Sequence, residues 1–167
     1  ARGPVPAIGP PSNPLLAPIP MLGVVAFNGF GSLLWPSVGL ADLDVPVLLV
    51  GGSVDLVTPP VQEQLNLFVH VSHPRSRLVV VDGGSHFSLV RLDNQGQALF
   101  RLGQELVGRD PRKVQNLILS LTTEFLQGLE YPFLLSPQRR LQEGGSAFVL
   151  DRTMARRWKA SLRSWPF

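Results

Sequence analysis

The chain has 167 residues, enough for one domain that buries most of the surface its unfolded form would expose. Hydrophobic residues make up 44% and charged residues 16%, a balance that argues against intrinsic disorder. Cysteine is absent, which excludes disulfides, thiolate metal sites and cysteine nucleophiles. The net charge of +3 is concentrated in residues 139–167, with no basic stripe in the body of the chain, so we expect no nucleic-acid binding.

The first twenty residues contain seven prolines, which cannot hold a helix or a central strand. We therefore expect a Pro-rich linker or insertion over residues 1–20, and a start of this kind is typical of a piece of a longer chain. No apolar run approaches the roughly 20 residues that span a bilayer. A signal peptide of a longer chain would lie upstream, so the compartment stays open, with the cytoplasm as the default.

Three short apolar runs predict buried strands: Met21–Phe27, Val45–Val50 and Arg77–Asp82. Each run is followed by Asn-Gly or Gly-Gly, which ends a strand in a turn. Runs that are apolar on both faces are typical of parallel strands covered by helices, whereas antiparallel strands alternate polar and apolar residues. The pattern therefore favours a parallel arrangement.

Two helices are predicted between and after these strands. The first begins with Thr58 as a hydroxyl N-cap before two prolines and continues to about Val69. The second runs from Asp110 to about Leu129, with apolar residues spaced three and four apart. We expect an α/β fold whose mostly parallel sheet, of about three strands here, is flanked by helices over residues 21–135.

Residues 136–167 are expected to form a basic C-terminal tail with a short amphipathic helix. Met154, Trp158 and Leu162 are four apart, and the basic residues lie largely elsewhere on the helical wheel. Two interpretations stay open. Either the helix docks on the body through its apolar stripe, or it is a surface helix that makes peripheral contact with an anionic membrane or a lipid substrate.

Two residues that could take part in catalysis follow neighbouring predicted strands. Asp55 comes after the second strand in VPVLLVGGSVDLVTPP, and His86 comes after the third in RLVVVDGGSHFS. Reactive groups of an open parallel sheet collect at the carboxyl ends of its strands. A carboxylate that accepts from one imidazole nitrogen leaves the other free to take a proton from a hydroxyl. Each residue alone could be an ordinary turn former or a solvated histidine, but the pair and its order favour catalysis.

The stretch from Met21 to Ser88 resembles the later part of an α/β-hydrolase. In detail it is similar to the cyanobacterial predicted dienelactone hydrolases related to platelet-activating-factor acetylhydrolases, through GSLLWPSVGLADLDVPVLLVGGSVDLVTPPVQEQ and LVVVDGGSHFS. The resemblance implies that Asp55 is the acid and His86 the base of a Ser-His-Asp triad. It covers about 70 residues, and its Asp and His loops are shared by many hydrolases.

The serine nucleophile of that family has no counterpart in the chain. No segment reads GxSxG, since GGSVD and GGSAF lack the final glycine. We expect the nucleophile and the oxyanion hole to lie upstream, so that this chain alone does not hydrolyse esters. Ser85 and Ser88 beside the base are expected to shape its loop, and His70 and His73 to end a helix rather than bind metal.

The leading hypothesis is the C-terminal part of a serine hydrolase that acts on small-molecule or lipid carboxylic esters, with catalytic residues Asp55 and His86. It requires no metal and no organic cofactor. The alternative is a catalytically inactive, hydrolase-like interaction domain. If neighbouring strands are missing, an apolar sheet edge is exposed, and we expect self-association.

Overall fold

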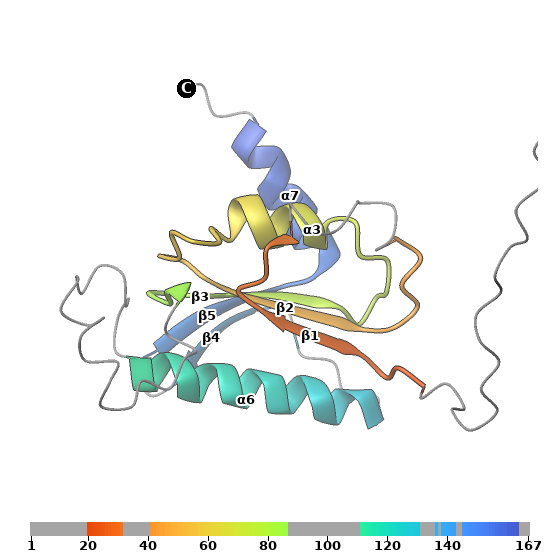
Figure 1. Cartoon of the computed structure of the whole chain (residues 1–167), viewed down its shortest axis with the longest axis horizontal. Coiled ribbons are helices and arrows are strands. Elements are labelled where there is room, and N and C mark those ends of the chain that lie inside the picture. Colours follow the sequence, from red (N-terminus) through yellow and green to blue (C-terminus); the bar gives the residue numbers. More distant parts are fainter. Residues whose placement is uncertain are drawn as a thin grey trace, which may run out of the picture.

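The computed structural model describes residues 20–31, 41–86, 111–130, 136, 138–142 and 145–163. In this part the protein has an α/β architecture of three layers, with one sheet between helices on both faces (Figure 1). The expected linker over residues 1–20 lies outside the described residues except for Pro20. No helix in the described ranges is long and apolar enough to span a membrane.

The sheet has five strands in the order β1-β2-β3-β5-β4. The strands β1 (Val24–Phe27), β2 (Val47–Gly52) and β3 (Arg77–Val81) are parallel, as expected from their apolar composition. The strand β5 (Gly145–Leu150) pairs antiparallel with β3, and β4 (Gln138–Gln142) pairs antiparallel with β5 at the edge of the sheet.

The expectation of a mostly parallel sheet of about three strands is therefore wrong. The described sheet is mixed, with two parallel and two antiparallel pairings. Both additional strands lie in residues 136–167, which we expected to be a basic tail with one helix. The segment Gln138–Gln142 reads QRRLQ and has no apolar alternation, because it is an edge strand whose pairing comes from its neighbour.

The central strands β2 and β3 are buried along their whole length. They contribute side chains to two hydrophobic clusters, one on each face of the sheet. Because successive side chains of a strand point to opposite faces, Leu48 and Val50 pack on one side while Val47 and Leu49 pack on the other. Full burial of each such aliphatic side chain stabilises the fold by roughly 1.5–3 kcal/mol. These strands therefore form a rigid base for the loops that leave their ends.

The lower face of the sheet in Figure 1 is covered by the helix α6 (Pro111–Glu130). Its buried face matches the predicted periodicity closely: Val114, Leu117, Ile118, Leu121 and Phe125 are buried in one cluster with β2, β3 and β5, and Leu129 packs against that cluster. The helix predicted from Asp110 to about Leu129 is confirmed in the described residues.

The opposite face is covered by η1 (Val61–Leu65), α3 (Asn66–Phe68) and α7 (Arg152–Arg163), as Figure 1 shows. The helix predicted after Thr58 is thus a π-helical turn followed by a short α-helical turn. Its N-cap is Pro60, and no side chain caps it, so the expectation that Thr58 is the N-cap is wrong. The Thr58 hydroxyl instead bonds to groups at the ends of the strands.

The helix α7 docks on the body through part of its apolar face. Ala155 is fully buried, and Trp158 and Leu162 pack against the cluster formed with α3 and the sheet. Met154 is 38% exposed and lies outside that contact. The helix therefore docks on the body through Trp158 and Leu162, as the first interpretation expected, and its basic side chains lie at the surface.

Candidate functional site at the carboxyl ends of the parallel strands

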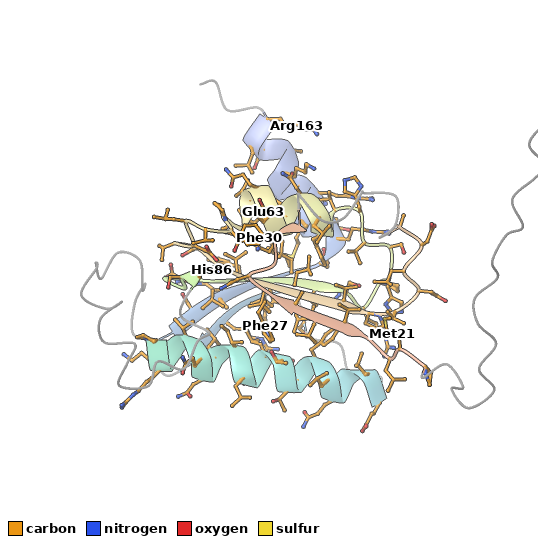
Figure 2. The ribbon with its side chains drawn as sticks, in the orientation of Figure 1. Met21, Phe27, Phe30, Glu63, His86 and Arg163 are labelled. Atoms are coloured by element: carbon orange, nitrogen blue, oxygen red, sulfur yellow. The ribbon has the colours of Figure 1, made fainter. Side chains whose placement is uncertain are left out.

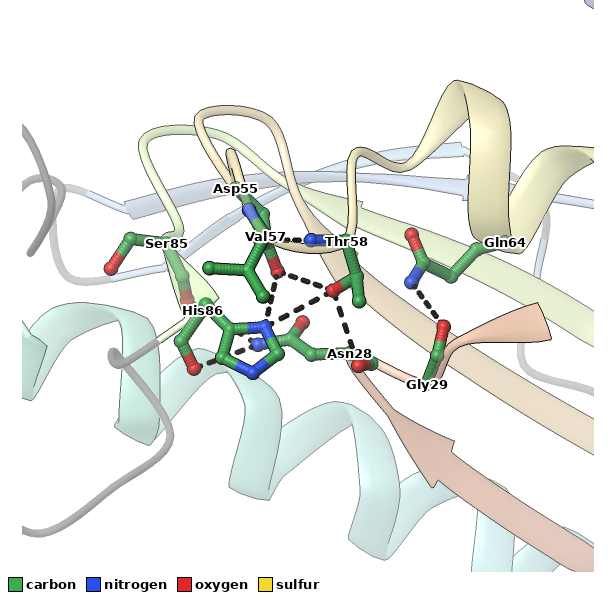
Figure 3. Close-up of polar contacts among 8 residues, drawn as sticks. All are labelled: Asn28, Gly29, Asp55, Val57, Thr58, Gln64, Ser85 and His86. Carbon is green, nitrogen blue, oxygen red and sulfur yellow. Dashed lines mark hydrogen bonds and ion pairs between the residues drawn. The ribbon is translucent and has the colours of Figure 1, made fainter. Parts of the chain in front are cut away.

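The candidate site lies where β1, β2 and β3 end on the same edge of the sheet (Figure 3). Asp55 follows β2 in a tight turn, and its side chain is fully buried. Its Oδ1 accepts hydrogen bonds from the backbone N–H groups of Val57 at 2.9 Å and Thr58 at 2.7 Å. These donors fix the carboxylate plane and leave Oδ2 facing the neighbouring loop.

His86 follows β3 and meets that oxygen. Its Nδ1 lies 3.1 Å from Asp55 Oδ2, and its side chain is 26% exposed. Because an ionised carboxylate only accepts hydrogen bonds, this contact places the hydrogen on Nδ1. The second ring nitrogen, Nε2, is on the ring edge that points away from Asp55 (Figure 3). The structure thus brings together the two residues that the sequence singled out 31 positions apart.

Thr58 is a third member of this network that the sequence analysis missed. Its Oγ1 lies 2.8 Å from Asp55 Oδ2 and 3.1 Å from both the Asn28 carbonyl and His86 Nδ1. The single hydroxyl hydrogen goes to Asp55 or Asn28, while the oxygen can share the hydrogen on Nδ1. Thr58 is fully buried, so it positions the pair rather than reacting itself.

Asn28, directly after β1, connects the third strand end to the same network. Its side-chain amide donates to the backbone carbonyl of His86 at 3.0 Å and to that of Ser85 at 3.4 Å. Its backbone has a φ of 45°, a left-handed conformation that asparagine adopts more readily than other side chains. From the sequence, the Asn28-Gly29 pair indicates only the end of a strand. The presence of asparagine before glycine is the one local signal for a left-handed residue at position 28.

The close approach of the two Gly-Gly turns explains how Asp55 and His86 meet. A Cβ atom on Gly52 would overlap the carbonyl of Gly84. The two loops are further joined because Val54 N–H donates to the Gly84 carbonyl at 3.0 Å and Gly83 N–H donates to Ser53 Oγ at 2.8 Å. Glycine is required because the backbones touch, so the repeated Gly-Gly has a structural cause.

One side of the imidazole is apolar. The Phe30 ring lies 6.3 Å from the His86 ring, centroid to centroid, at an angle of 55°. Phe30 also lines a cavity of about 120 Å³ between the end of β1 and η1, together with Ala26, Gly29, Gly31, Leu49, Gln64 and Leu67. The buried Gln64 amide donates to the Gly29 carbonyl at 3.0 Å, and its oxygen has no hydrogen-bond partner among the described residues. A mostly apolar hollow with one amide therefore adjoins the candidate base.

The remaining candidates have structural explanations. Ser85 is buried, and Ser88 lies outside the described residues. His70 lies in the turn after α3, and His73 Nδ1 accepts from the backbone N–H of Arg75 at 3.2 Å. Burial, reinforced by the charge of Arg75, lowers the pKa of His73, and Asp44 opposes this effect. Within the described ranges, no group of three metal-ligating side chains occurs.

A scan against protein-family models and searches of curated proteins and of solved structures found no match to this chain.

Proposed function

We propose that this chain is the C-terminal part of a serine hydrolase of carboxylic esters and supplies its acid, Asp55, and its base, His86. The observation that carries the proposal is the 3.1 Å contact between a fully buried Asp55 carboxylate and a part-exposed His86 imidazole. Both residues lie at the carboxyl ends of neighbouring parallel strands, where open α/β sheets collect reactive groups. The nucleophile is a serine outside the 167 residues, since GxSxG does not occur among them.

In the proposed mechanism, His86 Nε2 takes the proton from the serine hydroxyl as the oxygen attacks the ester carbonyl. The imidazolium then donates this proton to the leaving alcohol, and the acyl-enzyme forms. In the second half-reaction the same nitrogen deprotonates water, and the proton returns to the serine as the acid is released. No metal or organic cofactor is needed for these steps.

Asp55 keeps its carboxylate throughout the cycle. It holds the hydrogen on Nδ1, which leaves Nε2 as the basic nitrogen, and it stabilises the imidazolium when His86 is protonated. Two backbone N–H groups hold Asp55 in place, and Thr58 contacts both partners. Asn28 holds the backbone of His86. The base is thus positioned from all three parallel strand ends.

The mostly apolar surroundings support an ester substrate with an apolar group. The Phe30 ring lies 6.3 Å from the His86 ring, centroid to centroid, and it also lines the small cavity next to η1, so apolar surface lies near the imidazole. Such surface would bind a hydrocarbon portion of an ester by burial. A small-molecule ester and a lipid ester both satisfy this chemistry.

The test compares this chain with a version extended upstream through the first in-frame GxSxG segment. Each is assayed with a short-chain p-nitrophenyl ester, as the parent and as His86→Ala and Asp55→Asn. We expect hydrolysis only in the extended form, with kcat reduced by about 10³-fold or more in His86→Ala and Asp55→Asn. A fluorophosphonate probe should label the serine of the extended parent and label the His86→Ala variant far more slowly.

The matched control is Ser72→Ala, which removes a hydroxyl that donates to the Ala41 carbonyl at 2.9 Å, before the start of β3 and away from the carboxyl ends of the strands. It should change kcat by less than about tenfold, because it touches neither member of the pair. An inactive extended form, or one that keeps full activity without His86, would replace the proposal with the hydrolase-like interaction domain that lacks activity.

A further inference from the structure

A basic hollow lies between the turn after α3 and the outer face of α7, away from the candidate active site. Its volume is about 390 Å³, and it is lined by Val69, His70, Arg156, Lys159, Ala160 and Arg163. Figure 2 shows Arg163 at the end of α7 that is far from the sheet, whereas His86 lies at the sheet edge. The hollow belongs to neither the Asp55–His86 network nor the cavity beside Phe30.

The three cations of the hollow share one face of α7. Positions 156, 159 and 163 are three and four residues apart, which places their side chains above one another on a helix. The adjacent face of α7 packs on the body through Ala155, Trp158 and Leu162. The basic face is therefore left to solvent by the same packing that docks the helix.

These cations are not neutralised within the described structure. Residues 152–163 contain no acidic side chain, and Asp151 is engaged at the other end of the helix, where it accepts from Met154 N–H at 2.8 Å. None of the ion pairs in the described part involves Arg156, Lys159 or Arg163. Among the described residues, the Arg156 guanidinium donates to the Val69 carbonyl alone, at 3.4 Å, and this contact directs it across the hollow.

From this geometry we infer that the hollow binds a phosphate group. Two arginines supply planar, paired N–H donors that fit phosphate oxygens, and Lys159 adds a point charge between them. His70 adds a further nitrogen from the turn after α3. An anion seated here removes the mutual repulsion of three like charges and makes charge-assisted hydrogen bonds to each. This site would bind phosphate whether or not Asp55 and His86 are catalytic.

The experiment is a calorimetric titration of the full chain with inorganic phosphate at low and at moderate salt. We expect saturable binding with one site per chain, weaker at higher salt because the site is close to the surface. The triple variant Arg156→Gln/Lys159→Gln/Arg163→Gln should bind at least about tenfold more weakly. All three side chains are at least partly exposed, and circular dichroism verifies that the variant is folded.

The matched control is Arg112→Gln/Lys113→Gln/Arg157→Gln, which removes the same net charge from exposed positions that do not line the hollow. It should bind phosphate within about twofold of the parent. Equal losses in both triple variants would show a general charge effect and overturn the site, as would the absence of saturable binding. The single variant Lys159→Gln, with an intermediate loss, supports the site independently of any folding defect.

The source of the phosphate group is resolved with vesicles of phosphatidylcholine containing phosphatidate. If the chain binds inorganic phosphate and also sediments with these vesicles, in both cases through the three cations, then the ligand is a lipid headgroup. Binding to inorganic phosphate without sedimentation assigns a soluble phosphate ester. Sedimentation that is equal in the two triple variants, without saturable phosphate binding, would replace the site with a diffuse membrane-facing surface.

Discussion

The side chain of Asn28 holds the backbone of His86 across 58 positions of sequence, through a 3.0 Å hydrogen bond from Nδ2 to the His86 carbonyl. The Asn28 carbonyl in turn lies 3.1 Å from the Thr58 hydroxyl, which contacts Nδ1 of the same histidine. Asn28 is thus connected to both the main chain and the ring of the candidate base (Figure 3). Its backbone makes these contacts from a left-handed conformation, with a φ of 45°.

Two substitutions of Asn28 should distinguish the contribution of its side-chain hydrogen bonds to stability from that of its left-handed backbone. Asn28→Gly keeps the left-handed conformation and loses the two donated hydrogen bonds, so the free energy of unfolding should fall by about 1 kcal/mol. Asn28→Ala should lose about a further 1–2 kcal/mol, because alanine disfavours positive φ. Urea denaturation of the three proteins measures both effects. Equal stability of the two variants would contradict the contribution assigned to φ.

Thr58→Val should be more harmful than Thr58→Ser. Valine has nearly the same shape but removes the hydroxyl, and with it the one hydrogen available to the Asn28 carbonyl and Asp55 Oδ2, so the expected loss of stability is about 1–3 kcal/mol. In serine the hydroxyl is retained, so only a methyl contact is lost. The ¹⁵N shifts of the His86 ring give a readout specific to positioning: Thr58→Val should alter the population with hydrogen on Nδ1, and Thr58→Ser should restore it. Unchanged shifts in Thr58→Val would show that Asp55 alone holds the ring.

The sequence was sufficient for the elements whose patterns are local. The apolar runs around Val50 and Val79 and the periodicity around Leu117 depend on burial within each element, and these strands and this helix were found. The pair Asp55–His86 was also found, because parallel strands place their carboxyl ends on one edge.

What the sequence left out depends on contacts between distant segments. Strand β4 pairs through its backbone with β5, and its polar side chains carry no strand pattern. From its local sequence Thr58 is typical of a helix N-cap, and only the positions of Asn28 and His86 in the fold reveal its contacts with them. The hydrogen bonds of Asn28 reach residues more than 50 positions away, so local propensity could indicate only a turn.

Gly52→Ala should disrupt the approach of the two loops that bring Asp55 and His86 together. An added Cβ meets the Gly84 carbonyl, which is backbone and cannot swing aside as a side chain could. We expect a loss of about 2–3 kcal/mol of stability from overpacking, measured by denaturant unfolding. Gly29→Ala is the matched control, since no atom of the described residues, its chain neighbours aside, lies within 4 Å of its added Cβ, and it should stay within about 0.5 kcal/mol of the parent. Similar losses in both variants would rule out this close approach as the cause.

Strand β1 predicts self-association of the chain. It is at one edge of the sheet, with no strand beside it in the described part, and Phe27 at its end is 41% exposed. We expect dimers or larger species in sedimentation velocity, and Phe27→Lys should shift them toward monomer because a charge on an edge strand opposes pairing. Leu119→Lys, on the exposed side of α6, is the control and should not. A parent chain that is monomeric at high concentration would contradict the prediction.

The stability of the protein should depend on pH through His73. Burial and the neighbouring Arg75 charge lower its pKa below the ordinary value of 6.5, with Asp44 opposing, and its Nδ1 lone pair accepts from Arg75 N–H. Below about pH 6.5 the unfolded chain therefore binds more protons at this site than the folded one. The contribution of His73 is present above that pH and is lost as the pH falls from there toward the lowered folded-state pKa. Urea midpoints at pH 7.5 and 5.5 should differ less in His73→Asn than in the parent, while His70→Asn, at an exposed position, should behave as the parent does. If the midpoints of His73→Asn and the parent fall in parallel, the neutral imidazole contributes nothing to folding.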